Sequence, residues 1–331
     1  MWATTQERIS KALSQAESDD SCYAPITATD KRLLRRAYNE GSVVCPASGV
    51  YARQEYWETL SRESKELHKL RALSSAHPDW VFAGPSAALA HGLEVANRHL
   101  DHPCTATTRK SHAKSFKGFT HIIVTGDSPV KRNGVLVTSF VRTVYDCLRT
   151  FDFPSALAIA DSVLRTKGIS PERLVLNIHE ACSKKPGLKR VESIIEFADA
   201  RAENGGESKV RAQILKLGFA LPELQTETSD PLNPSKSYRA DFFWTLESGA
   251  IVIGELDGKD KYIDPKMADG KPTIDRLLAE RRREARLTLN EKPVRIMRFS
   301  FEEACDSEYF SDLLTAYGIP RTGDIPPVAL T

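Results

Sequence analysis

The 331-residue sequence has few cysteines and no regular pattern among them. Its six cysteines lie singly along the chain, none belongs to a Cys-x-x-Cys pair, and none has a histidine partner at zinc-binding spacing. Scattered single cysteines are typical of reduced cytosolic proteins, whereas disulfide frameworks and zinc sites need regular spacings. We therefore expect reduced thiols, a cytoplasmic protein and no zinc site.

Long apolar runs and an excess of charge are missing as well. No window reaches the roughly 18 apolar residues that a membrane-spanning helix needs, and no apolar segment follows the N-terminus. The 46 Lys and Arg residues nearly balance the 44 Asp and Glu residues. We expect no membrane partner, and any binding to nucleic acid must come from local basic patches.

The length of the chain predicts two or three domains. One boundary is predicted at Gly205 and Gly206, where helical sequence gives way to a new amphipathic helix that begins at Glu207. The order that follows predicts an α/β domain built on one mixed sheet, with helices over 207–217 and 273–289 and strands over 223–228, 238–244, 250–257 and 294–299.

The first sixty residues predict two helices and a short hairpin. Thr29 and Asp30 are predicted to cap the second helix, which has one apolar face and one basic face. The helix ends at 39–41, and strands over 43–45 and 50–53 follow. This order resembles the winged-helix segment of AbiEi-type antitoxins. The resemblance implies DNA docking through residues 29–53, and an ordinary solvated helix face is the alternative for its basic residues, Lys31, Arg32, Arg35 and Arg36.

The middle of the chain alternates helices with short strands. Gly84-Pro85-Ser86 is similar to a nucleophile elbow, but Ala88 stands where a second glycine is required, so a hydrolase is rejected. Ser86 is instead predicted to cap an alanine-rich helix, with His91 at its end making a local hydrogen bond. The stretch 138–146 also resembles AbiEi-like chains. Predicted strands cover 121–124 and 134–138, and predicted helices cover 58–75, 154–166, 171–183 and 188–202.

Three carboxylates stand in or beside apolar strand sequence. Asp241 precedes Phe-Phe-Trp, and Glu255 and Asp257 follow Ile-Val-Ile-Gly. Burying an unpaired charge costs several kcal/mol or shifts its pKa. Two strands joined by a short turn would bring these side chains together, and Asp257 shares a strand face with Glu255 by the two-residue period. A divalent cation is the natural compensation.

These residues, with Glu207, Gln225 and the arginine-rich stretch 281–286, resemble the Vsr-like, RecB-related branch of the PD-(D/E)XK nuclease superfamily over about residues 203–301. The resemblance implies a restriction-endonuclease-like α/β domain over 203–320, with a mixed central sheet flanked by helices. It would follow a winged-helix module over 1–60 and an AbiEi-like, mostly helical α+β region over 61–202. It also implies a Mg²⁺ site, with Mn²⁺ as a substitute, held by Asp241, Glu255, Asp257 and Glu207 and by the Leu256 carbonyl.

The sequence departs from the superfamily pattern at one position. Asp257 stands where a lysine is usual, so a catalytic lysine must come from Lys259 or Lys261. Lys261 is preferred because Lys-Tyr occupies the place where Vsr-like chains have a histidine. The alternative for both lysines is that they are ordinary loop charges that contact DNA or water. Gln225 is expected to bind a metal water or Glu255, or else to satisfy an edge backbone group.

The arginine-rich helix is the second basic patch. Arg282 and Arg286 lie one turn apart and are expected to follow DNA phosphates, with an intrahelical ion-pair ladder through Glu280 and Glu284 as the alternative. Further arginines are expected to flank the same groove, namely Arg239, Arg295 and Arg298.

Together these features predict a metal-dependent DNA endonuclease in defence, toxin–antitoxin function or repair, with DNA and a toxin–antitoxin or defence-system protein as partners. The alternative is a DNA-binding transcriptional regulator or antitoxin that keeps a catalytically inactive nuclease fold as a scaffold. A nucleotidyltransferase-like toxin would place a Gly-Ser turn before an Asp-x-Asp motif, and the sequence has no such turn there.

Overall fold

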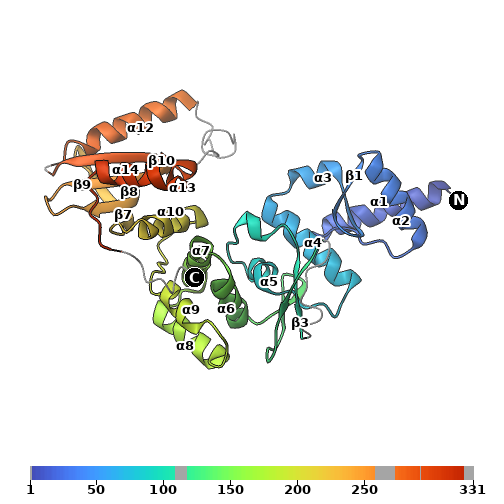
Figure 1. The fold of residues 1–331 in the computed structure, drawn as a ribbon. Coiled ribbons are helices and arrows are strands. Elements are labelled where there is room, and N and C mark those ends of the chain that lie inside the picture. The colour runs from blue at the N-terminus through green and yellow to red at the C-terminus, as the bar shows by residue number, and fades with distance from the viewer. Residues whose placement is uncertain (1, 109–117, 258–272, 291, 324–331) are drawn as a thin grey trace. The chain divides into compact units, whose positions relative to one another are not determined.

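The computed structural model describes residues 2–108, 118–257, 273–290 and 292–323 (Figure 1). The chain is a mixed α/β protein that divides into two compact units, Met1–Thr150 with Val175–Pro186 and Phe151–Leu174 with Gly187–Thr331. In the described ranges, no helix combines the length and apolar character that crossing a membrane requires.

The first unit begins with two helices and an antiparallel hairpin, as the sequence predicts. Helices α1 (Trp2–Ser18) and α2 (Ala28–Asn39) precede strands β1 (Val43–Ala47) and β2 (Val50–Arg53), in which Val43 pairs with Arg53. Their small shared core consists of Ile9, Leu13, Leu34, Val43 and Tyr51.

The predicted cap of α2 is wrong by two residues. Thr27 is the N-cap, and its hydroxyl accepts a hydrogen bond from the backbone N of Asp30 at 3.1 Å. Asp30 lies in the first helical turn and is only 1% exposed, because Arg8 on α1 binds its carboxylate at 2.5 and 2.7 Å. The partner that buries Asp30 is 22 residues away, so local capping rules do not reveal it.

The rest of the first unit contains helices and short strands. The helix predicted over 58–75 is two helices, because Leu60 is extended and Ser61 caps a new helix. The elements are α3 (Gln54–Thr59), α4 (Arg62–Ala76), α5 (Gly84–Ala90), a 3₁₀ turn (Asn97–His99), β3 (Cys104–Thr107), β4 (Thr120–Ile123), β5 (Val130–Arg132), β6 (Val135–Val137), α6 (Phe140–Thr150) and the later part of α8 (Pro171–Cys182).

Ser86 is not the cap of its helix. It lies inside α5, and its hydroxyl accepts a hydrogen bond from the backbone N of Cys104 at 2.9 Å, so it joins the helix to β3. His91 ends α5, and its Nε2 lies 2.9 Å from the carbonyl of Thr138, 47 residues away.

The second unit contains a four-stranded mixed sheet in the order β10-β9-β8-β7. Strands β7 (Glu223–Asp230), β8 (Asn233–Thr245) and β9 (Ile251–Asp257) are antiparallel neighbours, and β10 (Val294–Ser300) pairs with β9 in parallel. The helices are α7 (Phe153–Lys167), the start of α8, α9 (Leu188–Ile195), α10 (Gly205–Lys216), α12 (Thr273–Leu287), α13 (Phe301–Cys305) and α14 (Ser307–Ala316).

Helices cover both faces of this sheet. Figure 1 shows α12 along one face and α10 along the other. The larger core joins residues of α10, α13 and α14 to Phe242, Val252 and Phe299 of the strands, and the smaller core joins Leu287 of α12 to Ala240 and Ile253.

Close contacts and buried ion pairs hold the elements of the second unit together. Gly254 of β9 packs closely on β8, since a Cβ there would lie 3.1 Å from both Phe242 and Trp244. Helix α9 ends at Ile195, short of the predicted 202, and Asp161 of α7 accepts a hydrogen bond from the backbone N of Asp199 beyond it, at 2.7 Å. Arg211 of α10 binds the same buried Asp161 at 2.9 Å, which ties α7 to α10.

Candidate functional site

Three of the four predicted carboxylates, Glu207, Asp241 and Asp257, line a cavity of the second unit with a volume of about 580 Å³, which we call the carboxylate cavity. Glu255 is not among its described lining residues. It lies where the N-terminus of α10 faces β8, the end of β9 and the start of α13. Its lining residues are Glu203, Asn204, Gly206, Glu207, Arg239, Asp241, Leu256, Asp257, Ser300, Phe301 and Glu302.

Asp241 and Glu255 are brought together by strand pairing. The paired register of β8 and β9 ends at Phe242 and Gly254, so Asp241 and Glu255 each lie one residue beyond it on neighbouring strands. The charge of Asp241 raises the pKa of Glu255, which shows that the two carboxylates are close. One oxygen of Asp241 accepts a hydrogen bond from the backbone N of Leu256 at 3.0 Å. In the part of the chain that the structure describes, Asp241 forms no ion pair with Lys or Arg.

Glu207 is held by the first turn of α10. Asn204 caps this helix and accepts hydrogen bonds from the backbone N of Gly206 and Glu207. The Glu207 carboxylate in turn accepts from the backbone N of Glu203 at 2.8 Å and from the amide of Asn204 at 2.7 Å. The residue is 3% exposed. Burial raises the pKa of Glu207, and the charge of Asp241 raises it further, against the lowering effect of its hydrogen bonds.

Gln225 links β7 to this carboxylate. Its neighbours Leu224 and Thr226 pair with Phe242 and Ala240, so Gln225 lies level with Asp241. Its amide donates to Glu207 at 3.0 Å, so its partner is Glu207 rather than the predicted Glu255. The backbone has a φ of 53°, a left-handed conformation that non-glycine residues rarely adopt. Its Oε1 is buried and, within the described ranges, has no hydrogen-bond partner.

Glu255 and Asp257 face arginines. Glu255, 8% exposed, lies 3.1 Å from Arg283 of α12. Arg298 of β10 binds Asp257 at 2.5 Å and Glu284 of α12 at 2.8 Å. Burial raises the pKa of Glu255. The positive charge of Arg283 lowers this pKa, and the negative charge of Asp241 raises it. Two of the predicted metal ligands therefore have basic partners.

The described residues contain no group of three or more His, Cys, Asp or Glu side chains already arranged to hold a metal ion. The donor set nevertheless fits a hard cation, because all four predicted ligands are carboxylates and oxygen donors suit Mg²⁺ and Mn²⁺. The buried Oε1 of Gln225, next to Glu207, has no hydrogen-bond partner within the described ranges, so one acceptor beside the carboxylates is left unsatisfied.

The basic residues of α12 and β8 have specific partners. Arg286 binds Asp230 of β7 at 2.9 Å, and Tyr238 donates to the same carboxylate at 2.7 Å. Glu284 binds Arg298 of β10, a partner outside α12. Arg239 pairs with Glu203 at the cavity at 2.6 Å. Arg282 is exposed. Lys259 and Lys261 lie outside the described residues.

The basic face of α2 is exposed in the first unit. Lys31, Arg32, Arg35 and Arg36 all lie on the surface, and Arg36 forms an ion pair with Glu40 at 2.7 Å, one helical turn away. The role of these four residues toward DNA stays a prediction.

Sequence reasoning missed the specific partners of the carboxylates. The pair between Arg283 and Glu255 joins α12 to β9, and such a pair cannot be derived from spacing along one element. Asn204 was also missed, although Asn204 followed three residues later by Glu207 is the sequence signature of a helix start with a reciprocal cap.

The chain resembles two proteins of Mycobacterium tuberculosis, the uncharacterized protein MT2308 of strain CDC 1551 / Oshkosh and the uncharacterized protein Rv2248 of strain ATCC 25618 / H37Rv. It is 30% identical to each over 204 residues, which cover 62% of this chain and 70% of the relative. The chain therefore belongs to the same protein family as these two. No family model matches it, and no solved structure matches it.

Proposed function

We propose that this chain is a metal-dependent DNA endonuclease of the PD-(D/E)XK superfamily, with the carboxylate cavity as its active site. The main support is that Asp241 and Glu255 follow the last paired residues of neighbouring strands, and that the charge of Asp241 raises the pKa of both Glu255 and the buried Glu207 of α10. The mixed sheet between α12 and α10 supports a restriction-endonuclease-like fold for the second unit.

A bound Mg²⁺ or Mn²⁺ would supply charge stabilisation at phosphorus and lower the pKa of a water. Asp241 and Glu255 would hold the cation directly, with Glu207 and Asp257 as further carboxylates. Hydrolysis adds the oxygen of one water to the scissile phosphorus and breaks one P–O ester bond, and the leaving oxygen gains a proton.

The residues around the carboxylates have supporting roles in this proposal. Gln225 fixes the orientation of Glu207 through its 3.0 Å hydrogen bond. Arg239 at the cavity edge would contact the DNA backbone. Lys261, or Lys259 in its place, would orient the attacking water or neutralise charge that develops at phosphorus.

The exposed basic face of α2 would dock the protein on DNA. Deleting residues 1–60 would not test this docking role cleanly, because the deletion would also disrupt the fold of the first unit. Val50 and Ala52 of β2 belong to a hydrophobic core that also contains Leu70 and Leu73 of α4. Charge substitutions on α2 leave this core intact. We place the activity in defence, toxin–antitoxin function or repair, with a defence-system protein as a further partner.

The arginine pairs favour one second candidate function. With Glu255 bound to Arg283 and Asp257 bound to Arg298, the cavity is partly neutralised without a cation. This is the arrangement expected of a DNA-binding regulator or antitoxin that keeps the nuclease fold as an inactive scaffold.

A cleavage assay separates the two functions. Purified full-length protein is incubated with supercoiled, linear and single-stranded DNA in Mg²⁺, Mn²⁺ or EDTA. The nuclease proposal predicts metal-dependent cleavage of at least one substrate, its loss in EDTA and its loss in Asp241→Asn. Asp312→Asn, at an exposed position of α14, is the matched control and should cleave normally. Binding of DNA without cleavage in any metal would favour the regulator.

A further inference from the structure

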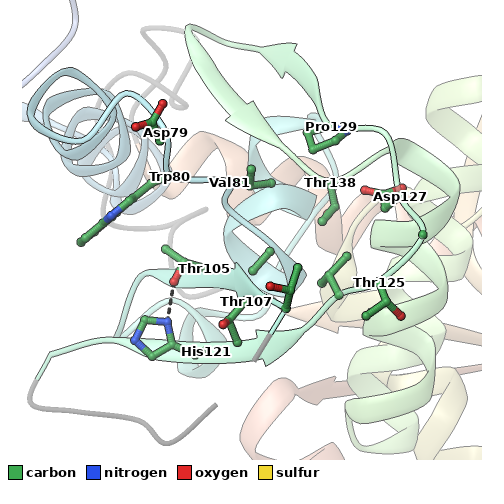
Figure 2. A pocket seen from close by; sticks show the side chains of 14 residues that line it. Asp79, Trp80, Val81, Thr105, Thr107, His121, Thr125, Asp127, Pro129 and Thr138 are labelled. Carbon is green, nitrogen blue, oxygen red and sulfur yellow. Dashed lines mark hydrogen bonds between the residues drawn. The ribbon is translucent and has the colours of Figure 1, made fainter. Parts of the chain in front are cut away.

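A second cavity lies entirely within the first unit and has a volume of about 590 Å³ (Figure 2). We call it the hydroxyl cavity because threonines are its most frequent lining residue. Its size is within the range of small-molecule sites. Its lining residues are Asp79, Trp80, Val81, Thr105, Ala106, Thr107, Thr108, His121, Val124, Thr125, Gly126, Asp127, Pro129 and Thr138.

The floor of the hydroxyl cavity is a joined strand platform. Phe82 bridges β3 through Thr105 and β6 through Val137, so the β3–β4 and β5–β6 pairs are continuous. Figure 2 shows Thr105 of β3 beside His121 of β4, and the hydroxyl of Thr105 lies 2.6 Å from Nδ1 of that histidine. Thr105, Val124 and Thr138 are buried, which places them at the base of the cavity.

The wall formed by residues 124–127 is fixed from behind. Both oxygens of Asp127 accept hydrogen bonds from Ser139, one from its hydroxyl at 2.5 Å and one from its backbone N at 3.0 Å. The carbonyl of Thr125 accepts from Arg142 at 3.2 Å and from Lys185 at 3.0 Å. A wall held by four such bonds is preformed, and a preformed site loses little entropy when it binds a ligand.

The charge of the described lining disfavours anionic ligands. Within the described part of the chain, the lining contains no Lys or Arg, whereas Asp79 at the exposed mouth and Asp127 on the wall are acidic. A phosphate or carboxylate group would meet these two negative charges, while the nearest basic groups, Arg142 and Lys185, lie behind the wall on the carbonyl of Thr125. A zwitterionic amino acid is disfavoured for the same reason.

The remaining surface alternates hydroxyls with apolar groups. Val81, Val124 and Pro129 offer flat apolar contacts, and threonine hydroxyls can both donate and accept hydrogen bonds. A heteroaromatic ring matches this lining because its faces are apolar and its edges carry donors and acceptors. A free sugar would set hydroxyl groups against the apolar side chains on all sides.

We propose that the hydroxyl cavity binds an uncharged nucleoside, with the base between the apolar side chains and its polar edge toward the threonines and His121. The site is separate from the carboxylate cavity and does not depend on the nuclease proposal.

The test measures the binding of adenosine, guanosine, cytidine and uridine to the full-length protein. Isothermal titration calorimetry gives the affinity and stoichiometry, and the fluorescence of Trp80 gives a second, independent signal. At least one nucleoside should bind with one site per chain. Its 5′-monophosphate should bind about five-fold more weakly or worse, since one unfavourable charge interaction in a wet site is worth about 1 kcal/mol. Glucose should not bind.

Two substitutions locate the site. Thr107→Val keeps the shape and strand preference of the residue and should weaken binding by about three- to ten-fold, because it removes one hydrogen bond to the ligand. Ala106→Leu fills the cavity and should abolish binding, with the melting temperature as a check on folding. Thr245→Val, at an exposed strand position of the second unit, is the control and should bind normally.

Three results would overturn the proposal. They are absence of binding by all four nucleosides, equal or tighter binding of the monophosphate, and unchanged binding in Thr107→Val and Ala106→Leu.

Discussion

Single residues set how much negative charge gathers in and beside the carboxylate cavity. Glu207 and Glu255 are both buried, and the charge of Asp241 raises the pKa of each of them. Such clustering destabilises a fold and is typical of sites that serve binding or catalysis. Gln225 adds a left-handed backbone and a buried oxygen without a hydrogen-bond partner in the described ranges, two costs at the same place.

The first prediction concerns Asp241. Asp241→Asn keeps the shape and an oxygen for the backbone N of Leu256, and it removes one of the mutually repelling charges. Without divalent cations it should raise the free energy of unfolding by about 1 kcal/mol, because each pKa unit of repulsion removed is worth about that much. Urea unfolding in EDTA measures the change, with Asp312→Asn as the control. A variant less stable than the wild type would contradict the expected repulsion between Asp241 and its neighbours Glu207 and Glu255.

At the scale of elements, ion pairs connect α12 to the sheet. Arg283 reaches Glu255, Arg286 reaches Asp230, and Arg298 of β10 reaches back to Glu284. The carboxylates of Glu255 and Asp230 are buried, whereas Glu284 belongs to α12 and is only partly buried. If the nuclease proposal holds, helix α12 would therefore compete with a cation for at least one carboxylate, that of Glu255.

The second prediction tests this competition. Arg283→Gln should tighten the affinity for Mn²⁺ by about five-fold, because Glu255 no longer has a fixed basic partner worth about 1 kcal/mol. Arg282→Gln removes the same charge from the next, exposed position of α12 and should change the affinity much less. Equal effects of the two substitutions would mean that only the overall charge matters.

The third prediction is a pH dependence. Hydrogen bonds from Tyr238, from the backbone N of Leu232 and from Arg286 lower the pKa of Asp230 to about 2. A lowered pKa contributes stability that is present above the ordinary value near 4 and is lost as the pH falls through the folded value. The stability difference between the wild type and Asp230→Asn should therefore be larger at about pH 7 than at about pH 3. Urea unfolding at both pH values measures it, and a constant difference would contradict the low pKa.

The elements were largely predictable from the sequence, whereas their partners were not. Strands β8, β9 and β10 follow from apolar runs that end at turn residues, and α10 follows from the glycines before Glu207. Ser86 was misplaced because its hydroxyl serves Cys104, 18 residues away. The arginine partners of Glu255 and Asp257 depend on how α12 and β10 lie against β9, which no local pattern encodes.

At the scale of the whole molecule, the two units divide the proposed tasks. The first has an exposed basic helix and the hydroxyl cavity, and the second has the carboxylate cavity. Because charge nearly balances over the chain, any attraction of DNA to the first unit must come from local basic patches, and the exposed face of α2 is one of them.

The fourth prediction concerns this patch. Replacing Lys31, Arg32 and Arg35 together by Gln should weaken DNA binding for all sequences. It should also reduce the slope of log affinity against log salt by about one for each DNA phosphate that the variant no longer neutralises. The control replaces the exposed Lys184, Lys189 and Lys216, which removes the same charge elsewhere. Equal losses of affinity in both triple variants would show that α2 has no special role.

The central claim is that Asp241 and Glu255 share one divalent cation. Titration of Mn²⁺ into the metal-free full-length protein, with free Mn²⁺ followed by electron paramagnetic resonance, tests it most directly. Binding should be saturable in the wild type and in Asp312→Asn, and it should be lost in both Asp241→Asn and Glu255→Gln. Undiminished Mn²⁺ binding in these last two variants would contradict it.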